Sequence, residues 1–479
     1  MKIISNHRVC TTLGTVAEYI NGRAFTPAEW GNEGLPIIRI KNLNDEKSKF
    51  HYSNKVFEER YLVKKGDLLF AWSASLGAYI WKKDDAWLNQ HIFLVNPNSF
   101  IEKLYLYYFL DKITRELYSS AHGSGMVHVT KKTFEATKIS LPSLPEQRAI
   151  VAKLEQLFSE LDNGIACLKK AQEQLKIYRQ AVLKQAFEGE LTKAWREQQT
   201  SHPSAQELLE TIKAERTQAA KLSGKKLQPV IPLTQAALIA LPELPDGWTW
   251  LKLGELTLGV EYGTSTKSLD NGDVPVIRMG NIQQGRIEWN NLAYTNEKAD
   301  ISKYSLTKGD VLFNRTNSPE LVGKTAIYNG EMPAIFAGYL IRINQIAVLL
   351  DCKYLNFWLN SHPAKVYGNS VKTDGVNQSN INGEKLKSYP LPYCSPQEQS
   401  QIVQEIETRL SVCDNMESTI KESVEKAEAL RQSILKKAFE GKLLSLEELQ
   451  ITRNAPDWEP ADKLLERIRA EKRTARNKH

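Results

Sequence analysis

The stretch RQAVLKQAFEGELT, at residues 179–192, returns as RQSILKKAFEGKLL at residues 431–444. A second, weaker repeat lies nearer the start of each half: LPIIRIKNL at residues 35–43 matches VPVIRMGNI at residues 274–282. The period is about 250 residues, so the repeated unit is half of the 479-residue chain. Two copies of so long a unit predict a pseudo-twofold molecule, because the repeats of solenoid proteins are short and number three or more.

Each copy contains a long proline-free segment with a heptad pattern. At residues 146–187 apolar side chains recur at alternating steps of four and three, which predicts a coiled-coil seam on a helix of about 60 Å. Prolines precede each predicted helix, and Gly189 or Gly441 follows it. If the first helix leads from one globular segment to the other, the second must lead back, so we expect an antiparallel pair. The first seam comprises Ile150, Leu154, Leu157, Leu161, Gly164, Leu168, Ala171, Leu175, Tyr178 and Val182.

The rest of the chain is divided by composition. Two segments are rich in short runs of aromatic and β-branched residues between Gly, Asn and Asp turns, and each ends in a helical stretch. We therefore predict an α+β protein: two globular domains separated by two long antiparallel coiled-coil helices. The expected segments are domain 1 at 1–142, a helix at 143–195, a linker with a short amphipathic helix at 196–245, domain 2 at 246–392, a second helix at 393–445 and a tail with a short helix at 446–479.

Composition gives modest bounds on location and partners. The five cysteines form no Cys-x-x-Cys pair, which favours a reducing compartment over a disulfide framework or a zinc cluster. No run reaches the length of a membrane span, and the N-terminus lacks the apolar core of a signal peptide. We expect a soluble cytoplasmic protein with no membrane partner. A net charge of +7 permits nucleic-acid binding without requiring it.

The search for catalytic motifs finds none that is complete. The segment SPELVGKT, at residues 318–325, has a serine where a phosphate-binding loop needs its first glycine. Asp45 and Lys47 match the end of a nuclease motif but lack an upstream acidic partner. His91 and His128 have no cysteine or carboxylate at metal-ligand spacing. We predict no catalytic and no metal site in this chain.

Polar loops flanked by aromatic residues remain as candidate binding sites. Arg, Asn, Gln, Lys and Ser are the side chains that pair with base edges or phosphates, although each such residue could equally line a solvated loop. Arg39 and Arg278 lie in strand-like runs, where an arginine can be either a binding residue or a structural ion-pair partner, and they are not among the predicted contacts. The predicted DNA contacts are Lys41, Asn42, Trp72, Ser73, Ser75, His128, Thr130, Lys131, Lys132, Asn281, Asn314, Arg315, Thr316, Asn317, Lys372, Asn377 and Gln378.

Taken together, the motifs resemble those of one family. Each long helix follows a proline-marked Glu-Gln pair and ends in Ala-Phe-x-Gly-x-Leu, and domain 2 starts with Leu-Pro-x-Gly-Trp at residues 244–248. This combination is similar to the specificity subunit of type I restriction-modification systems. Domain 1 departs from the start motif, because RVCTTLGTV at residues 8–16 keeps only the Leu-Gly element.

The resemblance implies two target recognition domains that each read one half of a bipartite, asymmetric site in double-stranded DNA, with the coiled coil as spacer. It also implies two modification subunits, which bind S-adenosylmethionine and methylate adenine N6, and two restriction subunits, which use ATP and Mg²⁺. By the same resemblance the chain is a non-catalytic subunit and binds no cofactor itself.

Two other functions stay open. A coiled-coil scaffold without DNA contact would be favoured if the purified complex showed no salt-sensitive DNA binding. A nuclease with an unrecognised site would be favoured if the chain alone cleaved DNA with Mg²⁺.

Overall fold

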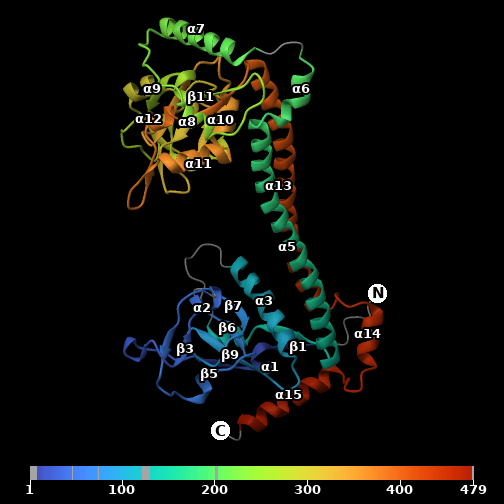
Figure 1. Ribbon diagram of the computed structural model, residues 1–479. Coiled ribbons are helices and arrows are strands. Elements are labelled where there is room, and N and C mark those ends of the chain that lie inside the picture. Colours follow the sequence, from blue (N-terminus) through green and yellow to red (C-terminus); the bar gives the residue numbers. More distant parts are fainter. Residues whose placement is uncertain (1–7, 46, 74, 121–129, 200–202, 477–479) are drawn as a thin grey trace. The chain divides into compact units, whose positions relative to one another are not determined.

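The computed structural model describes residues 8–476 apart from 46, 74, 121–129 and 200–202 (Figure 1). The chain forms two compact units: unit 1 comprises Met1–Lys169 and Lys421–His479, and unit 2 comprises Lys170–Ile420. Two long helices, α5 (Leu144–Phe187) and α13 (Pro396–Phe439), each contribute one end to each unit. The two predicted long helices are therefore confirmed.

Domain 1, in unit 1, is built on two four-stranded sheets of order β2-β9-β6-β7 and β4-β3-β8-β5, with a separate pair β1-β10. Helix α3 (Lys103–Ser120) contacts β6 and β7. The strands are β1 (Val9–Thr12), β2 (Ala17–Asn21), β3 (Leu35–Ile38), β4 (His51–Ser53), β5 (Leu62–Val63), β6 (Leu68–Ala71), β7 (Gly77–Ile80), β8 (Ala86–Leu88), β9 (Ile92–Pro97) and β10 (Lys138–Leu141). The short helices are α1 (Leu13–Val16), η2 (Pro27–Glu29), α2 (Ile40–Asn44), η3 (Glu59–Tyr61) and α4 (Lys131–Glu135).

Domain 2, in unit 2, repeats this plan. Its six-stranded sheet runs β12-β21-β17-β19-β15-β14, and smaller sheets run β16-β13-β20, β18-β23-β22 and β11-β24. The strands are β11 (Thr249–Lys252), β12 (Thr257–Tyr262), β13 (Val274–Ile277), β14 (Ile282–Gln283), β15 (Gly285–Ile287), β16 (Ala293–Thr295), β17 (Val311–Asn314), β18 (Thr316–Asn317), β19 (Thr325–Ile327), β20 (Ile335–Phe336), β21 (Leu340–Gln345), β22 (Thr373–Asp374), β23 (Ser379–Asn380) and β24 (Pro390–Tyr393). The helices are η5 (Leu253–Leu256), η6 (Met279–Asn281), α9 (Lys298–Tyr304), α10 (Cys352–Leu359), α11 (His362–Val371) and α12 (Gly383–Lys387).

The strand orders demonstrate the internal repeat. The run β12-β21-β17-β19 in domain 2 has the order of β2-β9-β6-β7 in domain 1, and β16-β13-β20 has the order of β4-β3-β8. The predicted α+β class and the repeat are confirmed, although the sequence echo in these segments is weak.

Each domain core includes an end of each long helix. In unit 1, Ile150 and Leu154 of α5 are fully buried in one cluster with Phe70 and Phe93 of the sheet and Leu435 of α13. Burying a side chain of this size stabilises the fold by roughly 1.5–3 kcal/mol. The helix ends are thus integral parts of the domains.

Unit 2 has the same construction. Phe187, at the end of α5, packs edge-to-face against Tyr354 and Trp358 of α10. Val182 of α5 and Ile406 of α13 belong to the same buried cluster. In unit 2 the late part of α5 therefore meets the early part of α13, and in unit 1 the early part of α5 meets the late part of α13. This pairing confirms the predicted antiparallel direction.

A left-handed glycine ends each long helix. Gly189 and Gly441 both have φ of +76°, a conformation that L side chains rarely adopt. A Cβ added at Gly189 would lie 2.4 Å from a side-chain carbon of Pro245, so the site is also too close-packed for any other residue. The left-handed backbone therefore favours glycine at both positions, and close packing adds to this at Gly189.

Short helices follow each long helix, and one helix of each set packs into the core of the domain of the same unit. Between α5 and domain 2 these are η4 (Glu190–Thr192), α6 (Lys193–Glu197), α7 (Ala205–Ser223) and α8 (Gln235–Ile239). In the tail these are α14 (Leu446–Arg453) and α15 (Ala461–Arg476). Leu208 and Ile212 of α7 join the core of domain 2, and Leu464 and Ile468 of α15 join that of domain 1. Among the described residues, no helix is long and apolar enough to cross a membrane.

Candidate nucleic-acid interface

Equivalent asparagines close the turn that follows β3 and β13. The side-chain oxygen of Asn42 accepts the N–H of Arg39 at 3.1 Å, and its amide group donates to the carbonyls of Ser48 and Lys49 at 3.3 and 3.2 Å. Asn42 is 5% exposed, and its hydrogen-bonding groups are occupied. The side chain therefore shapes the turn, and its hydrogen-bonding groups are not available to a ligand in this conformation.

Asn281 does the same in domain 2. Its oxygen accepts the N–H of Arg278 at 3.0 Å, and its amide group donates to the carbonyls of Glu288 and Asn290 at 3.1 and 2.9 Å. Asn281 is buried, and its hydrogen-bonding groups are likewise occupied by the turn.

Two further candidates are buried. The Asn314 side chain is fully buried at the end of β17, and its amide group donates to the carbonyl of Leu321. Ser73 is also buried. Burial places both side chains out of reach of DNA in this conformation.

In domain 1 the loop after β6 meets the end of α2. Asn44 donates to the hydroxyl of Ser75 at 3.0 Å, and the hydroxyl of Tyr79 donates to Asn44 at 2.5 Å. Lys41, on the same short helix, is exposed. Trp72 is half-buried, with its ring stacked at 5.8 Å on Phe93. The structure thus brings Ser75 and the end of α2 together.

The start of α4 holds the next group. Thr130 caps this helix by accepting the N–H of Thr133, and Lys131 donates to the carbonyl of Tyr19 at 2.6 Å. Lys132 is exposed. His128 lies outside the described residues. Of the predicted residues here, Lys132 has the side chain most available to a phosphate.

In domain 2, two loops distant in sequence form one small sheet. Strand β18, which contains Thr316 and Asn317, pairs with β23, and β23 pairs with β22. Asn380 donates to the hydroxyl of Thr316 at 2.7 Å. The sequence suggested both loops separately, and the structure joins them in one surface.

Arg315 lies beside this sheet and stacks on an aromatic ring. Its guanidinium carbon is 4.9 Å from the ring centre of Tyr262, and Nη1 donates to the carbonyl of Gly338 at 3.3 Å. Tyr262 is partly exposed. Tyr339, which directly follows Gly338 in the chain, is exposed as well. Tyr262 and Tyr339 were missed from the sequence. The signal for Tyr262 was an aromatic residue beside a glycine turn in the strand equivalent to β2.

The remaining candidates occupy the ribbon of β22 and β23. Lys372 is held by the carbonyl of Pro319 at 3.3 Å and lies 3.7 Å from the carboxylate of Asp374. Asn377 and Gln378 are exposed in the turn. One surface of domain 2 therefore carries Arg315, Thr316, Asn317, Lys372, Asn377 and Gln378.

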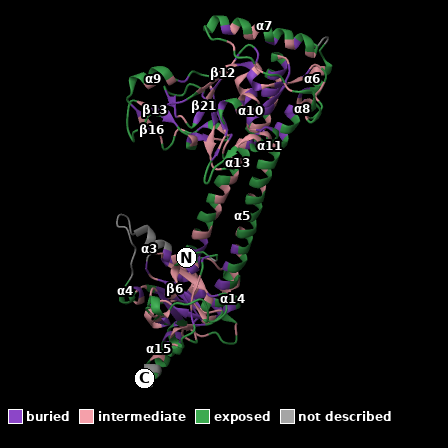
Figure 2. Cartoon of the chain, turned by 60° about the vertical axis from the view of Figure 1, so that its left-hand side comes forward, coloured by how far each residue is buried: buried purple, intermediate pink, exposed green. Residues whose placement is uncertain are grey.

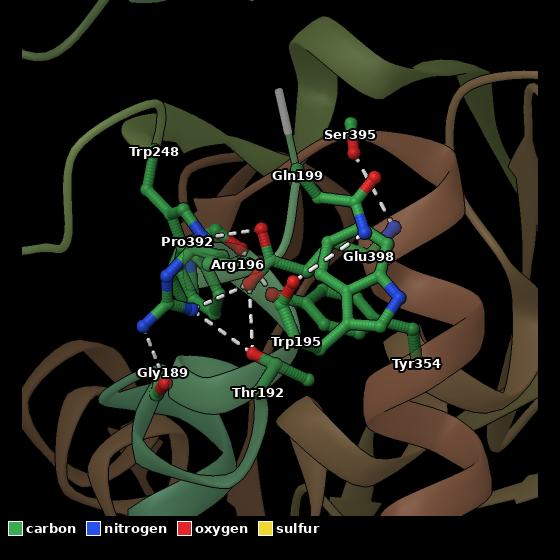
Figure 3. A network of polar contacts seen from close by, with 10 residues as sticks. All are labelled: Gly189, Thr192, Trp195, Arg196, Gln199, Trp248, Tyr354, Pro392, Ser395 and Glu398. Carbon is green, nitrogen blue, oxygen red and sulfur yellow. Dashed lines mark hydrogen bonds and ion pairs between the residues drawn. The ribbon is translucent and has the colours of Figure 1, made fainter. Parts of the chain in front are cut away.

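The Glu-Gln pair at the start of α13 anchors domain 2 to the helix. Figure 3 shows Glu398 accepting hydrogen bonds from the indole of Trp248 at 2.9 Å, the hydroxyl of Thr192 at 2.7 Å and the guanidinium of Arg196. Gln399 accepts the N–H of Asp351 and donates to two carbonyls. A buried carboxylate is stable here because charged and polar donors surround it.

Unit 1 uses the equivalent pair. Glu146 accepts two hydrogen bonds from Arg8, at 2.9 and 2.6 Å. Gln147 accepts the N–H of Glu102 at 2.9 Å and donates to the carbonyl of Pro142 at 3.1 Å. The sequence shows the Glu-Gln motif, but only the structure shows that it joins helix to domain.

Reciprocal ion pairs join the long helices. In unit 2, Arg179 of α5 pairs with Asp414 of α13 at 2.6 Å, and Arg286 of β15 pairs with the same carboxylate at 2.7 Å. Burial tends to raise the pKa of Asp414, but hydrogen bonds from the two arginines hold it below its ordinary value. In unit 1, Arg431 of α13 pairs with Asp162 of α5. Each pair joins the arginine of one repeat to the aspartate of the other.

The described residues contain no group of three His, Cys, Asp or Glu side chains that could hold a metal ion. The site geometry consists of polar and cationic side chains on projecting loops, carried by two domains of one plan.

Comparison with known proteins assigns this architecture. Residues 10–170 and 245–426 match the family model described as the type I restriction modification DNA specificity domain. The chain is 26% identical to the EcoBI specificity subunit of Escherichia coli over 96% of this chain and 91% of that protein. It is also 26% identical to the EcoKI specificity subunit of Escherichia coli K12, over 97% and 95% of the two chains.

One solved structure shares the fold. It is described as the structural basis underlying complex assembly and conformational transition of the type I R-M system, with a TM-score of 0.62 at 18% identity, over 91% of this chain and 98% of that one. The matched segments of the family model contain both domains and most of both long helices. The chain therefore belongs to the type I restriction-modification DNA specificity family, whose members are non-catalytic subunits that recognise DNA sequence.

Proposed function

We propose that the chain reads a bipartite, asymmetric site in double-stranded DNA, one half with each domain. The observation that carries this proposal is that one scaffold presents different side chains at equivalent places. Strands β6 and β17 occupy the same position in the sheet order, yet Trp72 follows the first and Arg315 follows the second. Different groups on the same scaffold recognise different base pairs, so the two half-sites differ in sequence.

The long helices act as the spacer between the half-sites. When one domain is bound, the other is held at a high effective concentration near the second half-site, and only a matching spacing allows both to bind. Recognition then depends on the number of base pairs between the half-sites as well as on their sequence.

In this proposal the partner subunits carry out the methylation and cleavage of DNA. Methylation of an adenine in a duplex requires the base to leave the stack, and a protein that holds DNA on both sides can keep it there. In this proposal two modification subunits supply S-adenosylmethionine and N6-methylation, and two restriction subunits supply ATP-dependent cleavage with Mg²⁺. This chain binds none of these cofactors.

The middle parts of the helices offer a docking surface for the modification subunits. In unit 2 a shallow apolar groove of about 530 Å³ is lined by Leu175 and Tyr178 of α5 and by Val412 and Met416 of α13. Tyr178, Val412 and Met416 are each about half exposed, and Figure 2 shows exposed residues along much of α5. An apolar stripe left open on a two-helix pair favours further helices as partners.

The test is to map methylated adenines in a host that expresses the chain with its partners. Exchange of residues 246–392 for the equivalent domain of a relative is expected to change one half of the methylated site only. A change in both halves would rule out independent reading. Absence of salt-sensitive DNA binding by the complex would favour a scaffold, and Mg²⁺-dependent cleavage by the chain alone would favour a nuclease.

A further inference from the structure

The ribbon of β22 and β23 in domain 2 is firmly held at its base. The two strands pair through Thr373 with Asn380 and Asp374 with Ser379, and β18 pairs with the other edge of β23. Lys385 donates to the hydroxyl of Thr373 at 2.6 Å, and the hydroxyl of Ser379 donates to the carboxylate of Asp374. The turn is closed by a hydrogen bond from the N–H of Gly375 to the carbonyl of Gln378 at 2.8 Å.

The side chains at the tip of this ribbon, residues 376–378, make no such contacts with the part of the chain that the structure describes. Val376 is 100% exposed, more than any other large apolar side chain among the described residues. Asn377 and Gln378, next to it, are exposed and make no side-chain hydrogen bond to the residues the structure describes. An ordered ribbon with an unpartnered apolar tip is suited to contact another molecule.

The side chains at the tip are suited to the base edges in the major groove of DNA. A two-stranded ribbon fits the major groove, where the C5-methyl group of thymine is the apolar feature and adenine is read by the amides of Asn or Gln. Cationic Lys372 and Arg315 lie on the same small sheet or beside it, where they would favour phosphates. Insertion between base pairs in the minor groove fits less well, because the side chains that act as such wedges are Phe, Leu, Ile, Met and Pro, and valine is not among them.

We propose that Val376 reads the methyl group of a thymine in the major groove of the half-site bound by domain 2. Asn377 and Gln378 then face the neighbouring base pairs. This inference rests on the proposed function, and it names a chemical feature of the DNA that one side chain recognises.

The experiment couples one methyl group on DNA to one side chain on the protein. The full chain is purified with its modification subunits, the methylated site is mapped, and each thymine of both half-sites is replaced in turn by deoxyuridine, which lacks only the methyl group. We expect one position at which the replacement weakens binding by about 3- to 5-fold, the effect of losing one buried methyl group. Val376→Ala is expected to weaken binding to the unmodified site by a similar factor and to abolish the sensitivity to deoxyuridine at that position.

Two controls separate the outcomes. Val348→Ala removes another exposed valine of unit 2 and should leave the deoxyuridine profile unchanged. Val376→Ala should not alter thermal unfolding, because the side chain is fully exposed.

Two results would overturn the inference: no thymine at which the methyl group matters, or equal sensitivity to deoxyuridine in the wild type and Val376→Ala. Loss of affinity in Val376→Ala that is the same for every duplex would indicate a wedge or a backbone contact instead. A complex that methylates no defined site would refute the proposed function itself.

Discussion

Each long helix buries an equivalent glutamate near its start, but the residues that donate hydrogen bonds to the two glutamates differ. In unit 2, Glu398 accepts hydrogen bonds from Trp248, Thr192 and Arg196. Thr192 and Arg196 lie between α5 and domain 2, and Trp248 lies at the start of domain 2. In unit 1, Glu146 is held by Arg8.

Arg8 takes the place of both Trp248 and Arg196 at this junction. It directly precedes β1 as Trp248 precedes β11, and both strands pair with the strand that leads into the long helix. Arg8 also donates to the carbonyl of Ala438 near the end of α13, as Arg196 donates to that of Gly189 at the end of α5. Unit 2 reaches this junction through a continuous linker, whereas unit 1 assembles it from both parts of the chain. Both junctions therefore contain a buried carboxylate, but its hydrogen-bond donors come from different parts of the chain in the two units.

If the two sequence repeats are equivalent, one repeat should pair with a second copy of itself. A fragment of residues 1–221 is expected to form an antiparallel dimer, because Val182 and Phe187 correspond to Ile434 and Phe439, which complete the core of unit 1. Dimers with twofold symmetry bind half-sites of that symmetry. With modification subunits, the fragment should therefore methylate a palindromic split site. A sizing column and methylation mapping test both statements.

The ion pairs offer a control for that dimer. The spacing from Asp162 to Arg179 equals that from Asp414 to Arg431, so the dimer would form the Asp162–Arg179 pair twice. Asp162→Arg should weaken the dimer, and Asp162→Arg with Arg179→Asp should restore it. A folded fragment that remains monomeric, or a dimer that methylates a non-palindromic site, would contradict the pseudo-twofold interpretation.

The second prediction compares the two glutamates directly. Glu398→Ala should destabilise unit 2 by about 3 kcal/mol, because it leaves donors from three residues without their buried carboxylate. Glu146→Ala should cost less, about 2 kcal/mol, because Arg8 alone loses its partner. Hydrogen exchange at the helix starts measures both, with the exposed Glu197→Ala as control. Equal costs would show that the number of donors does not matter.

The third prediction concerns the surface of domain 2. Arg315→Ala should cost roughly 1–3 kcal/mol of binding and relax the preference at one base pair, whereas Lys372→Ala should weaken binding to all sequences alike and reduce the salt dependence by about one phosphate contact. Affinities for single-base variants of the mapped site at several salt concentrations separate the two effects. Uniform weakening by both substitutions would place Arg315 on the phosphate backbone.

The smallest effect is expected at Asp414. Its pKa in the folded chain lies below the ordinary value of 3.8, so the stabilisation is complete above about pH 5 and is lost as the pH falls through the lowered pKa. Asp414→Asn should cost about 1 kcal/mol at neutral pH, since the pair is partly exposed, and the difference from the wild type should shrink below about pH 4. Urea unfolding across this range measures it, and a difference that does not depend on pH would exclude the ion pairs as its cause.

Some of the candidate surface was predictable and some was not. The loops that follow the matching runs GDLLF (residues 66–70) and GDVLF (residues 309–313) were located from sequence, because turn residues between apolar runs mark projecting loops. Within them, Asn314 is buried while Arg315, the next residue, reaches the face where Tyr262 lies. Successive residues of an extended chain point to opposite faces, so a register uncertain by one residue reverses the assignment.

The sequence by itself determined the repeat, the two long helices, their antiparallel direction and the family, because these follow from duplicated motifs and from a heptad period that is visible along the chain. Tertiary structure decided which polar side chains remain available. Asn42 and Asn281 lose their hydrogen-bonding capacity to turns, and the ribbon that displays Val376 depends on β18 and β23, which are far apart in the chain. Burial and hydrogen bonding of this kind depend on contacts between distant segments, which no local pattern specifies.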